Sequence, residues 1–144
     1  MYKRILIPLD NSASDQAILE HIGPLVKMMK SHVILVHVAD GFAARLQNQL
    51  NLADSDEITK DADYLKQRSA QLQSQGVSVE HHLLSGDPAG EILKFVQSHN
   101  FDLIAMSTHG HKYLSDVILG SVANALRHNT DVPILMVRSR PKES

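Results

Sequence analysis

The amino-acid sequence predicts one α/β domain, spanning residues 1–144, in which a five-stranded parallel sheet carries helices on both faces. The length of 144 residues fits a single domain. Five short apolar runs alternate along the chain with amphipathic patterns of helical period. Several of these runs are continuous Val, Ile and Leu, which is typical of strands that are covered on both faces. Right-handed crossover connections then make the strands parallel.

The apolar runs give the predicted strands. We expect them at Ile5–Leu9, Val33–Val38, Val77–Leu84, Leu103–Met106 and Ile134–Val137. The third run differs from the others because Ser78, Glu80 and His82 alternate with other residues. We therefore expect this strand nearer an edge of the sheet, with one face partly wet.

Helices are predicted between the strands. Apolar residues recur at steps of three and four over 13–29 and predict the first helix. Ser12 or Ser14 can cap its start, and Asp15 adds favourable charge to its first turn. A second helix is expected over 55–75, ended by Gly76. Its inward residues are predicted to be Ile58, Ala62, Leu65 and Leu72.

Asp87 and Pro88 predict the start of a third helix, as an N-cap followed by proline at the first helical position. The fourth helix is expected over about 120–128, with an extra turn from Ser115 left open. The connection Gly41–Asp54 is unusually long, so we expect a short helix of its own or a flap near the site. Residues 139–144 are expected to be a frayed tail.

Composition excludes several classes of function. The formal net charge is −2 and Lys and Arg form no basic stripe, which argues against nucleic acid as a principal partner. The absence of cysteine excludes disulfide scaffolds, thiolate zinc sites and thiol redox switches. No run approaches the roughly 18 apolar residues that span a bilayer, and the N-terminal apolar stretch is too short for a secretory signal. We therefore expect a soluble, cytoplasmic protein that is not membrane-embedded.

Residues 103–121 are the most informative segment. An apolar run ends at Met106, Gly110 and Gly120 follow, and Ser121 opens a helical pattern. Glycine lets backbone N–H groups approach a ligand closely, and a helix start adds unpaired donors and positive dipole. The segment therefore suits an anion such as a triphosphate. A plain strand-to-helix connection with two turn glycines fits the same pattern, and local chemistry favours neither.

Ligands of such sheets bind beyond the carboxyl ends of the strands, where the strand order reverses. The first strand ends in Pro8-Leu9-Asp10, where a carboxylate can accept hydrogen bonds from a ribose or help to hold a metal ion. Two further strand-end aspartates are weaker candidates. Asp40 precedes Gly41 in a common turn signal, and capping accounts for Asp87.

Other side chains give weaker signals. His109 and His111 alternate in the glycine loop, where an imidazole can contact a phosphate, but they predict no protein-built metal site. Lys112 can offset phosphate charge, although an exposed loop lysine is usually only solvated. Val38 can line a base pocket or belong to the core. No Ser-His-Asp or paired-carboxylate arrangement can be argued from spacing, so no catalytic residue is predicted.

Six segments, in the same order along the chain, carry a resemblance to a known family. They are residues 2–12, 33–38, 86–88, 101–106, 120–123 and 132–137. In these segments the chain resembles the universal stress protein family. The resemblance implies a Rossmann-like sheet with strand order 3-2-1-4-5.

The ATP-binding branch of that family has Gly, two residues, Gly, nine residues, and then Gly-Ser or Gly-Thr. In this chain Gly110 is followed, after nine residues, by Gly120-Ser121, but Ser107 replaces the first glycine. The hydroxyl of Ser107 could donate to a phosphate, so the departure weakens the case without closing it. The resemblance implies ATP as ligand, with Mg²⁺ carried mainly by the phosphates.

The resemblance also implies which residues contact the nucleotide. Asp10 would contact the ribose and Val38 the adenine. The triphosphate would contact Gly110, Gly120, Ser121 and Val122, in a loop that Ser107 and His109 also line. The predicted site is completed by Pro8, Leu9 and Met106.

A homodimer is implied as well. The last strand, Ile134–Val137, is expected at an edge, where apolar residues and open backbone groups are an association hazard for a monomer. Pairing two such edges about a two-fold axis would satisfy these groups, and higher assembly stays open. Pro133 removes one donor only at the strand start.

The leading hypothesis is an ATP-binding regulator of the stress response, in which nucleotide occupancy tunes loop order and oligomer assembly. Similar proteins serve in stress survival and sometimes beside membrane transporters, so a regulated partner such as a transporter is compatible with it. A nucleotide-free dimeric interaction protein of the same fold is one alternative. A slow ATPase or self-phosphorylating protein is another, and it is less favoured because no general base is visible.

Overall fold

Five parallel strands form one sheet in the order β3-β2-β1-β4-β5, which confirms the predicted topology. The computed structural model describes residues 1–40, 56–109 and 114–139. The strands are β1 (Arg4–Pro8), β2 (His32–Asp40), β3 (Ser78–Gly86), β4 (Leu103–His109) and β5 (Ile134–Ser139). Ser139, which the sequence analysis assigns to the tail, is therefore the last residue of β5.

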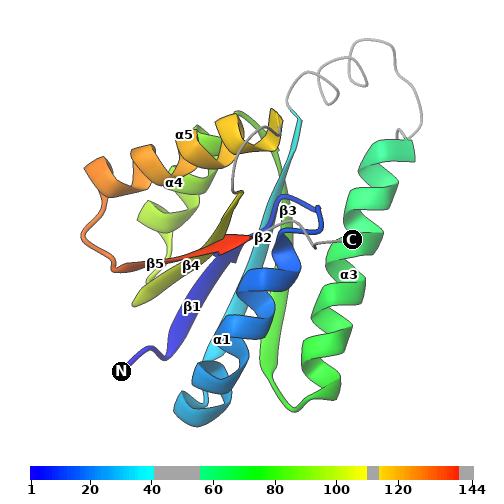
Figure 1. Cartoon of the computed structure of the whole chain (residues 1–144), viewed down its shortest axis with the longest axis vertical. Coiled ribbons are helices and arrows are strands. Elements are labelled where there is room, and N and C mark those ends of the chain that lie inside the picture. The colour runs from blue at the N-terminus through cyan, green and yellow to red at the C-terminus, as the bar shows by residue number, and fades with distance from the viewer. Residues whose placement is uncertain (41–55, 110–113, 140–144) are drawn as a thin grey trace.

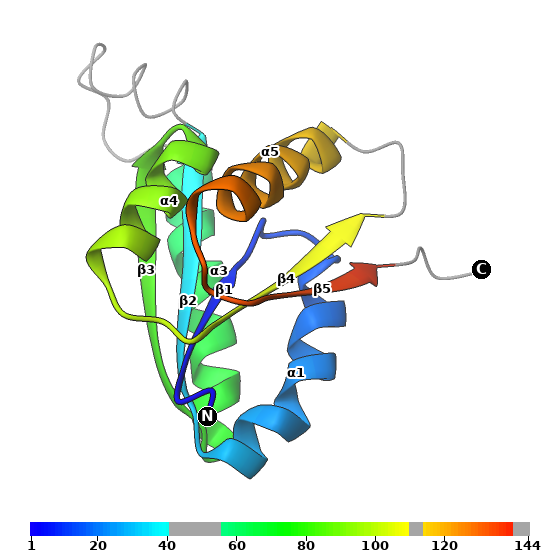
Figure 2. The same ribbon diagram turned by 90° about the vertical axis from the view of Figure 1, so that its left-hand side faces the viewer.

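Helices cover both faces of the sheet, as predicted. In the described residues they are α1 (Asp15–Met29), α3 (Asp56–Ser74), α4 (Pro88–Ser98) and α5 (Leu114–Asn129). Figure 1 shows α1 and α3 on one face and α4 and α5 on the other, and the turned view in Figure 2 agrees. The connection Gly41–Asp54, for which a short helix or a flap is expected, lies outside the described residues.

The core has two apolar layers because the central strands are buried on both faces. Residues 5–8 of β1 are all buried. One layer packs beneath α4 and α5 around Leu6 and Ile104, and the other packs beneath α1 and α3 around Ile5 and Ile7. β3 contains only exposed and half-buried residues, as expected for an edge strand.

The starts of α1 and α4 show that capping is only partly readable from sequence. At α4 the Asp87 carboxylate accepts a hydrogen bond of 2.8 Å from Gly90 N–H, as the Asp-Pro pair predicts. At α1 the prediction holds for Ser12, whose hydroxyl oxygen accepts the main-chain N–H of Ser14 at 3.2 Å, but not for the N-cap residue Ser14, which makes no side-chain capping bond. Its hydroxyl is instead directed to Asp10.

Two further expectations about the helices are corrected. Helix α5 begins at Leu114, which confirms the extra turn left open from Ser115 and places Gly120 inside the helix rather than at its start. In α3, Leu65 and Leu72 are buried as predicted, but Ala62 is exposed. The inner face of α3 near its start instead carries polar residues, which belong to the site described next.

Candidate functional site

The strand order reverses between β1 and β4, and the two strands part there toward their carboxyl ends. Their register ends at Leu6 and Ile104. Beyond that point β1 stays beside β2, where Pro8 pairs with Val36, while β4 stays beside β5 as far as His109. Figure 2 shows β4 and β5 turning away from β1 and β2. Open α/β sheets bind ligands at such a switch point.

The turn that follows β1 is organised around the carboxylate of Asp10. Its Oδ1 atom accepts hydrogen bonds from Ser12 N–H at 3.0 Å and from the Ser12 hydroxyl at 2.6 Å. The Ser14 hydroxyl donates to the same oxygen at 3.2 Å. Asn11 has a φ of 59°, a left-handed conformation that asparagine tolerates well. The turn thus fixes a carboxylate at the switch point, where the sequence predicts the ribose contact.

A second carboxylate, that of Asp15, lies directly beside Asp10. The Asp15 side chain is only 2% exposed. Its Oδ1 accepts the main-chain N–H of Asp10 at 3.1 Å, and its Oδ2 accepts the Tyr64 hydroxyl at 2.9 Å. Burial, together with the negative charge of Asp10, raises the pKa of Asp15 to about 7. The sequence analysis misses this pair and gives Asp15 only a role in the first helical turn.

Helix α3 closes this group of side chains. Arg68 donates from Nε to the Tyr64 hydroxyl at 3.0 Å and from Nη1 to Gln16 Oε1 at 2.7 Å. Burial and the charge of Asp15 raise the pKa of Tyr64 to about 12. Arg68 and Gln16 also line a cleft of about 530 Å³ between α1 and α3. We call Asp10, Ser12, Ser14, Asp15 and Tyr64 the Asp10–Asp15 cluster.

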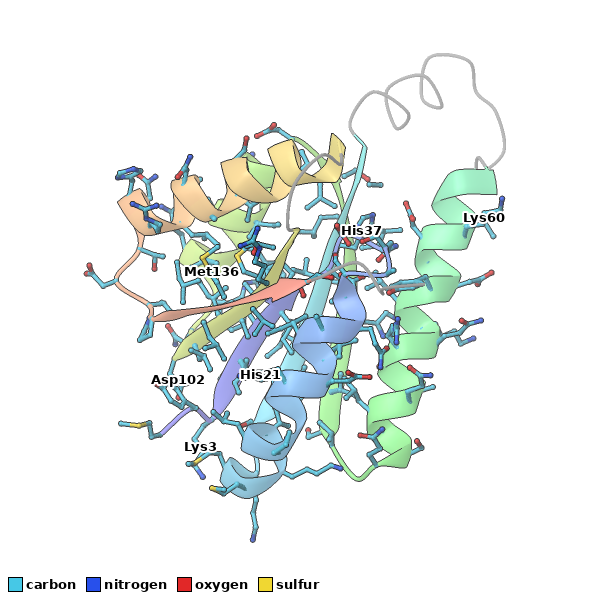
Figure 3. All side chains as sticks on the ribbon, viewed as in Figure 1. Lys3, His21, His37, Lys60, Asp102 and Met136 are labelled. Carbon is cyan, nitrogen blue, oxygen red and sulfur yellow. The ribbon has the colours of Figure 1, made fainter. Side chains whose placement is uncertain are left out.

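A histidine extends the cluster onto β2. His37 Nδ1 lies 2.8 Å from the carbonyl oxygen of Leu9, so it carries the hydrogen there. Its Nε2 atom lies 3.4 Å from Asp61 of α3, whose carboxylate also accepts the Asn11 amide at 3.0 Å. Figure 3 places His37 toward the end of the sheet opposite to Lys3 and Asp102. The sequence carries one sign of this polar group. Asp61, Tyr64 and Arg68 are three and four residues apart, so they share one face of a helix.

Ser107 is also turned toward α1. The side chain is 3% exposed, and its hydroxyl donates to the carbonyl oxygen of Ser14 at 2.7 Å. The hydroxyl oxygen of Ser107 in turn accepts the N–H of Ile18 at 3.2 Å. The hydroxyl hydrogen is therefore given to a main-chain carbonyl, which corrects the expectation that it could donate to a phosphate. A hydroxyl has one hydrogen, and here the first turn of α1 receives it.

The apolar members of the predicted site lie on both faces of the sheet, because Leu9 belongs to the cluster beneath α1 and α3. Val38, Met106 and Val122 are buried in one cluster, beneath α4 and α5. Pro8 and Leu9 are buried at the end of β1. The carboxylate of Asp10 and the apolar group therefore occupy the same end of the sheet, as the ends of parallel strands must. The contact of Val38 with a base stays a prediction.

The glycine segment is placed differently from the expectation. Gly120 and Ser121 are exposed and lie within α5. The open N–H groups of a helix belong to its first turn, which is 114–117 here, so the predicted helix start at Ser121 is wrong. His109 ends β4, opposite Ser139. Gly110, with its predicted phosphate contact, lies outside the described residues.

The described residues contain neither a metal-binding cluster nor a membrane-spanning helix. Among residues 1–40, 56–109 and 114–139, no group of three His, Asp or Glu side chains could hold a metal ion. In the same part of the chain, no helix has the length and apolar character to cross a membrane.

The chain is similar to known α/β proteins in both fold and sequence. The sheet order and switch point are those of a Rossmann-like α/β protein, and the solved structure of MJ0577 from Methanocaldococcus jannaschii superimposes with a TM-score of 0.76 at 29% identity, covering 100% of this chain and 99% of that one. The model of the universal stress protein family matches residues 1–138. The chain belongs to the universal stress protein family.

Two further relatives illustrate the similarity. Universal stress protein MJ0531 of Methanocaldococcus jannaschii is 31% identical over 150 residues, which cover 99% of this chain and 86% of that protein. The universal stress protein of Archaeoglobus fulgidus in complex with dAMP has a TM-score of 0.68 at 18% identity, and the match covers 94% of this chain and 98% of that one. The second comparison shows the shared fold.

Proposed function

We propose that this protein binds an adenine nucleotide, ATP with Mg²⁺, at the switch point between β1 and β4. The observation that carries the proposal is the parting of β1 and β4 beyond Leu6 and Ile104, beside a carboxylate held by the turn after β1. The dAMP complex of the Archaeoglobus fulgidus relative supports the choice of ligand class.

The residues present fit the parts of a nucleotide. Asp10 accepts hydrogen bonds from the ribose hydroxyls, because an ionised carboxylate offers only acceptors. Val38 is the predicted contact of the adenine ring, and the fully buried Met106 packs in the same apolar cluster behind it. Gly110, Gly120, Ser121 and Val122 remain the predicted triphosphate contacts. Mg²⁺ neutralises phosphate charge and is held mainly by the phosphates themselves.

Gly120 gives the strongest local support for a nucleotide at this site. Among the described residues, a Cβ atom added at this position would meet no atom within 4 Å beyond its chain neighbours and its own helix backbone, so their packing does not require glycine there. Glycine inside a helix costs about 0.5–1 kcal/mol relative to alanine. Close approach of a ligand to the exposed surface of α5 accounts for a residue that the fold alone does not favour.

We also propose that the nucleotide acts as a regulator through a homodimer. The register pairs Ser107, Thr108 and His109 of β4 with the last three residues of β5, so the two strand ends move together. β5 is an edge strand and presents Met136, which is 44% exposed. Pairing of two Ile134–Val137 edges would cover this side chain and satisfy open backbone groups. Nucleotide occupancy would then bias dimer geometry.

One observation favours a second function, a nucleotide-free dimeric interaction protein. Ser107 replaces the first glycine of the family's ATP motif, and its hydroxyl is bound to α1 instead of facing a ligand loop. In this alternative the β5 edge carries the function and the switch point is vestigial.

Nucleotide binding separates the two functions. We expect 5 mM ATP with excess Mg²⁺ to raise the midpoint of thermal unfolding, because a ligand that binds only the folded state stabilises it by mass action. GTP serves as the base control, and Asp10→Asn removes one carboxylate oxygen without changing shape. Native mass spectrometry of the purified protein reports retained nucleotide and stoichiometry together. No thermal shift and no bound nucleotide would leave only the interaction protein.

A further inference from the structure

Asp15 is a buried ionisable group that the proposed nucleotide contacts do not use. It is the first residue of α1 and is 2% exposed. Both of its oxygens accept hydrogen bonds, one from Asp10 N–H and one from the Tyr64 hydroxyl. The first bond holds the main chain of Asp10, the predicted ribose contact, and the second joins Asp15 to α3. Asp15 therefore supports the main chain of the site from its buried side.

Among the residues that the structure describes, no positively charged group binds Asp15. Asp10 faces it from the turn after β1, and Tyr64 faces it from α3. Arg68 donates to Tyr64 Oη and to Gln16, and in the described residues no Lys, Arg or His forms an ion pair with Asp15. On β4 the Ser107 hydroxyl binds Ser14 and Ile18. The buried carboxylate of Asp15 therefore lies beside the half-buried carboxylate of Asp10.

The cluster can satisfy either protonation state of Asp15. When Asp15 is ionised, the Tyr64 hydroxyl donates to Asp15 Oδ2 at 2.9 Å. When Oδ2 carries a proton, it donates to Tyr64 Oη, and the tyrosine hydrogen turns to the carbonyl oxygen of Ser12, which lies 3.4 Å away. Oδ1 accepts Asp10 N–H in both states. Asp10 itself accepts three donors on Oδ1, a setting that suits the ionised form.

We propose that Asp15 is a positioning residue of the nucleotide site and that it takes up one proton from solvent when a phosphate-bearing nucleotide binds beside Asp10. The inference rests on the proposed function. An incoming anion and the exclusion of water both disfavour a second negative charge in the cluster. The proton goes to Asp15 Oδ2, and no covalent bond to the ligand forms or breaks.

The sign of the effect follows from linkage. In the free protein Asp15 already titrates near neutral pH, with a pKa of about 7. Binding that raises this pKa further is tighter at low pH than at high pH. A rise of one unit makes the affinity about tenfold tighter well below both pKa values than well above them.

Asp15→Asn is the decisive variant. The amide keeps the shape and the hydrogen-bonding pattern of the protonated acid, because its oxygen can accept Asp10 N–H and its nitrogen can donate to Tyr64 Oη. Asp102→Asn is the matched control. The Asp102 carboxylate also accepts two main-chain N–H groups, from Lys3 and Arg4, but it lies at the opposite end of the sheet (Figure 3).

Calorimetric titration with MgATP tests the inference between pH 6 and pH 8.5. Each titration is run in two buffers of different ionisation enthalpy, which reports the protons taken up. We expect the wild type and Asp102→Asn to take up more protons than Asp15→Asn near pH 7. We also expect their affinity to fall at least threefold more between pH 6 and pH 8.5. The titration of ATP itself is common to all three proteins and cancels in the comparison.

A second measurement does not depend on any variant. The ¹³C carboxyl resonance of Asp15 in the wild-type protein is followed against pH with and without MgATP, and its midpoint should rise by at least about half a unit on binding. Equal proton uptake by wild type and Asp15→Asn, or an unmoved midpoint, overturns the inference while nucleotide binding stands. Absence of any binding heat at every pH overturns the nucleotide site, and the inference with it.

Discussion

The hydroxyl of Ser107 on β4 donates a 2.7 Å hydrogen bond to the carbonyl oxygen of Ser14, at the start of α1. The same hydroxyl oxygen accepts the N–H of Ile18, four residues further along. A helical hydrogen bond would join these same two main-chain groups. Ser107 therefore connects β4 to the first turn of α1 through two hydrogen bonds.

This relationship predicts that Ser107 acts on stability rather than on ligand affinity. Ser107→Ala leaves buried partners without their hydrogen bonds, and we expect a loss of about 1–3 kcal/mol in the free energy of unfolding. MgATP affinity should change less than threefold. Urea denaturation and calorimetry measure the two effects.

Ser31→Ala is the reference for that experiment. The Ser31 hydroxyl is likewise buried and donates to a main-chain carbonyl, that of Tyr2, on the far side of the sheet. A tenfold loss of affinity in Ser107→Ala, with no such loss in Ser31→Ala, would restore Ser107 as a ligand contact.

Gly120→Ala should have opposite effects on the stability of the free protein and on its affinity for the nucleotide. In the described part of the chain the new methyl group meets no atom within 4 Å beyond its own helix backbone and chain neighbours, so the free protein should gain about 0.5–1 kcal/mol from helix propensity. Nucleotide affinity should fall about tenfold, because the methyl group occupies the surface that the ligand approaches. Asn124→Ala, one turn further along α5, raises helix propensity without this loss. Unchanged affinity in Gly120→Ala would remove Gly120 from the site.

The buried carboxyl of Asp15 predicts a pH-dependent stability. Its pKa is about 7 in the folded protein against an ordinary 3.8, so the folded state binds the proton more tightly than the unfolded state. Its stabilising contribution is complete below pH 3.8 and is lost as the pH rises through 7. At ~1.4 kcal/mol per unit, the contribution is at most about 4 kcal/mol. Asp15→Asn should therefore be more stable than wild type at pH 8, and the difference should shrink toward pH 5.

Urea denaturation at both pH values checks this prediction. Other groups titrate in both proteins, so the quantity of interest is the difference between the two curves. A difference that stays constant from pH 5 to pH 8 would show that Asp15 does not titrate in this range.

Met136→Lys should separate the two protomers of the proposed dimer. Met136 is 44% exposed on the edge strand β5, and a charge there would face its own copy across a two-fold axis. We expect sedimentation velocity to show a monomer, with at least about tenfold weaker association. Met28→Lys is the control, because Met28 is 75% exposed on α1. A dimer that survives Met136→Lys would assign the interface to another surface.

The strands could be predicted because their signal is local. Continuous apolar runs such as Val33–Val38 mark β2, and the alternation after Val77 marks an edge. Once the strand order is known from the family resemblance, the position of the switch point follows from it. The start of α5 could not be placed, since the glycine at 120 looks like a helix boundary when its tertiary role is unknown.

The polar half of the site could not be predicted, because it is assembled from distant segments. Asp15 reads as a favourable first-turn charge in a helix, and nothing local indicates that Tyr64, 49 residues away, will bury it. Ser107 reads as a motif change near a phosphate until its partner Ser14, 93 residues away, is known. Pairing at such separations depends on the packing of α1 and α3 against the sheet, which sequence periodicity does not encode.

The ladder between β4 and β5 has a mechanical consequence. Ser107, Thr108 and His109 are matched one for one with Val137, Arg138 and Ser139. Main-chain hydrogen bonds therefore connect the end of β4 directly to the edge strand β5, without a side chain between them. If a ligand displaced the end of β4, this ladder would give the displacement a main-chain route to the outer edge of the sheet.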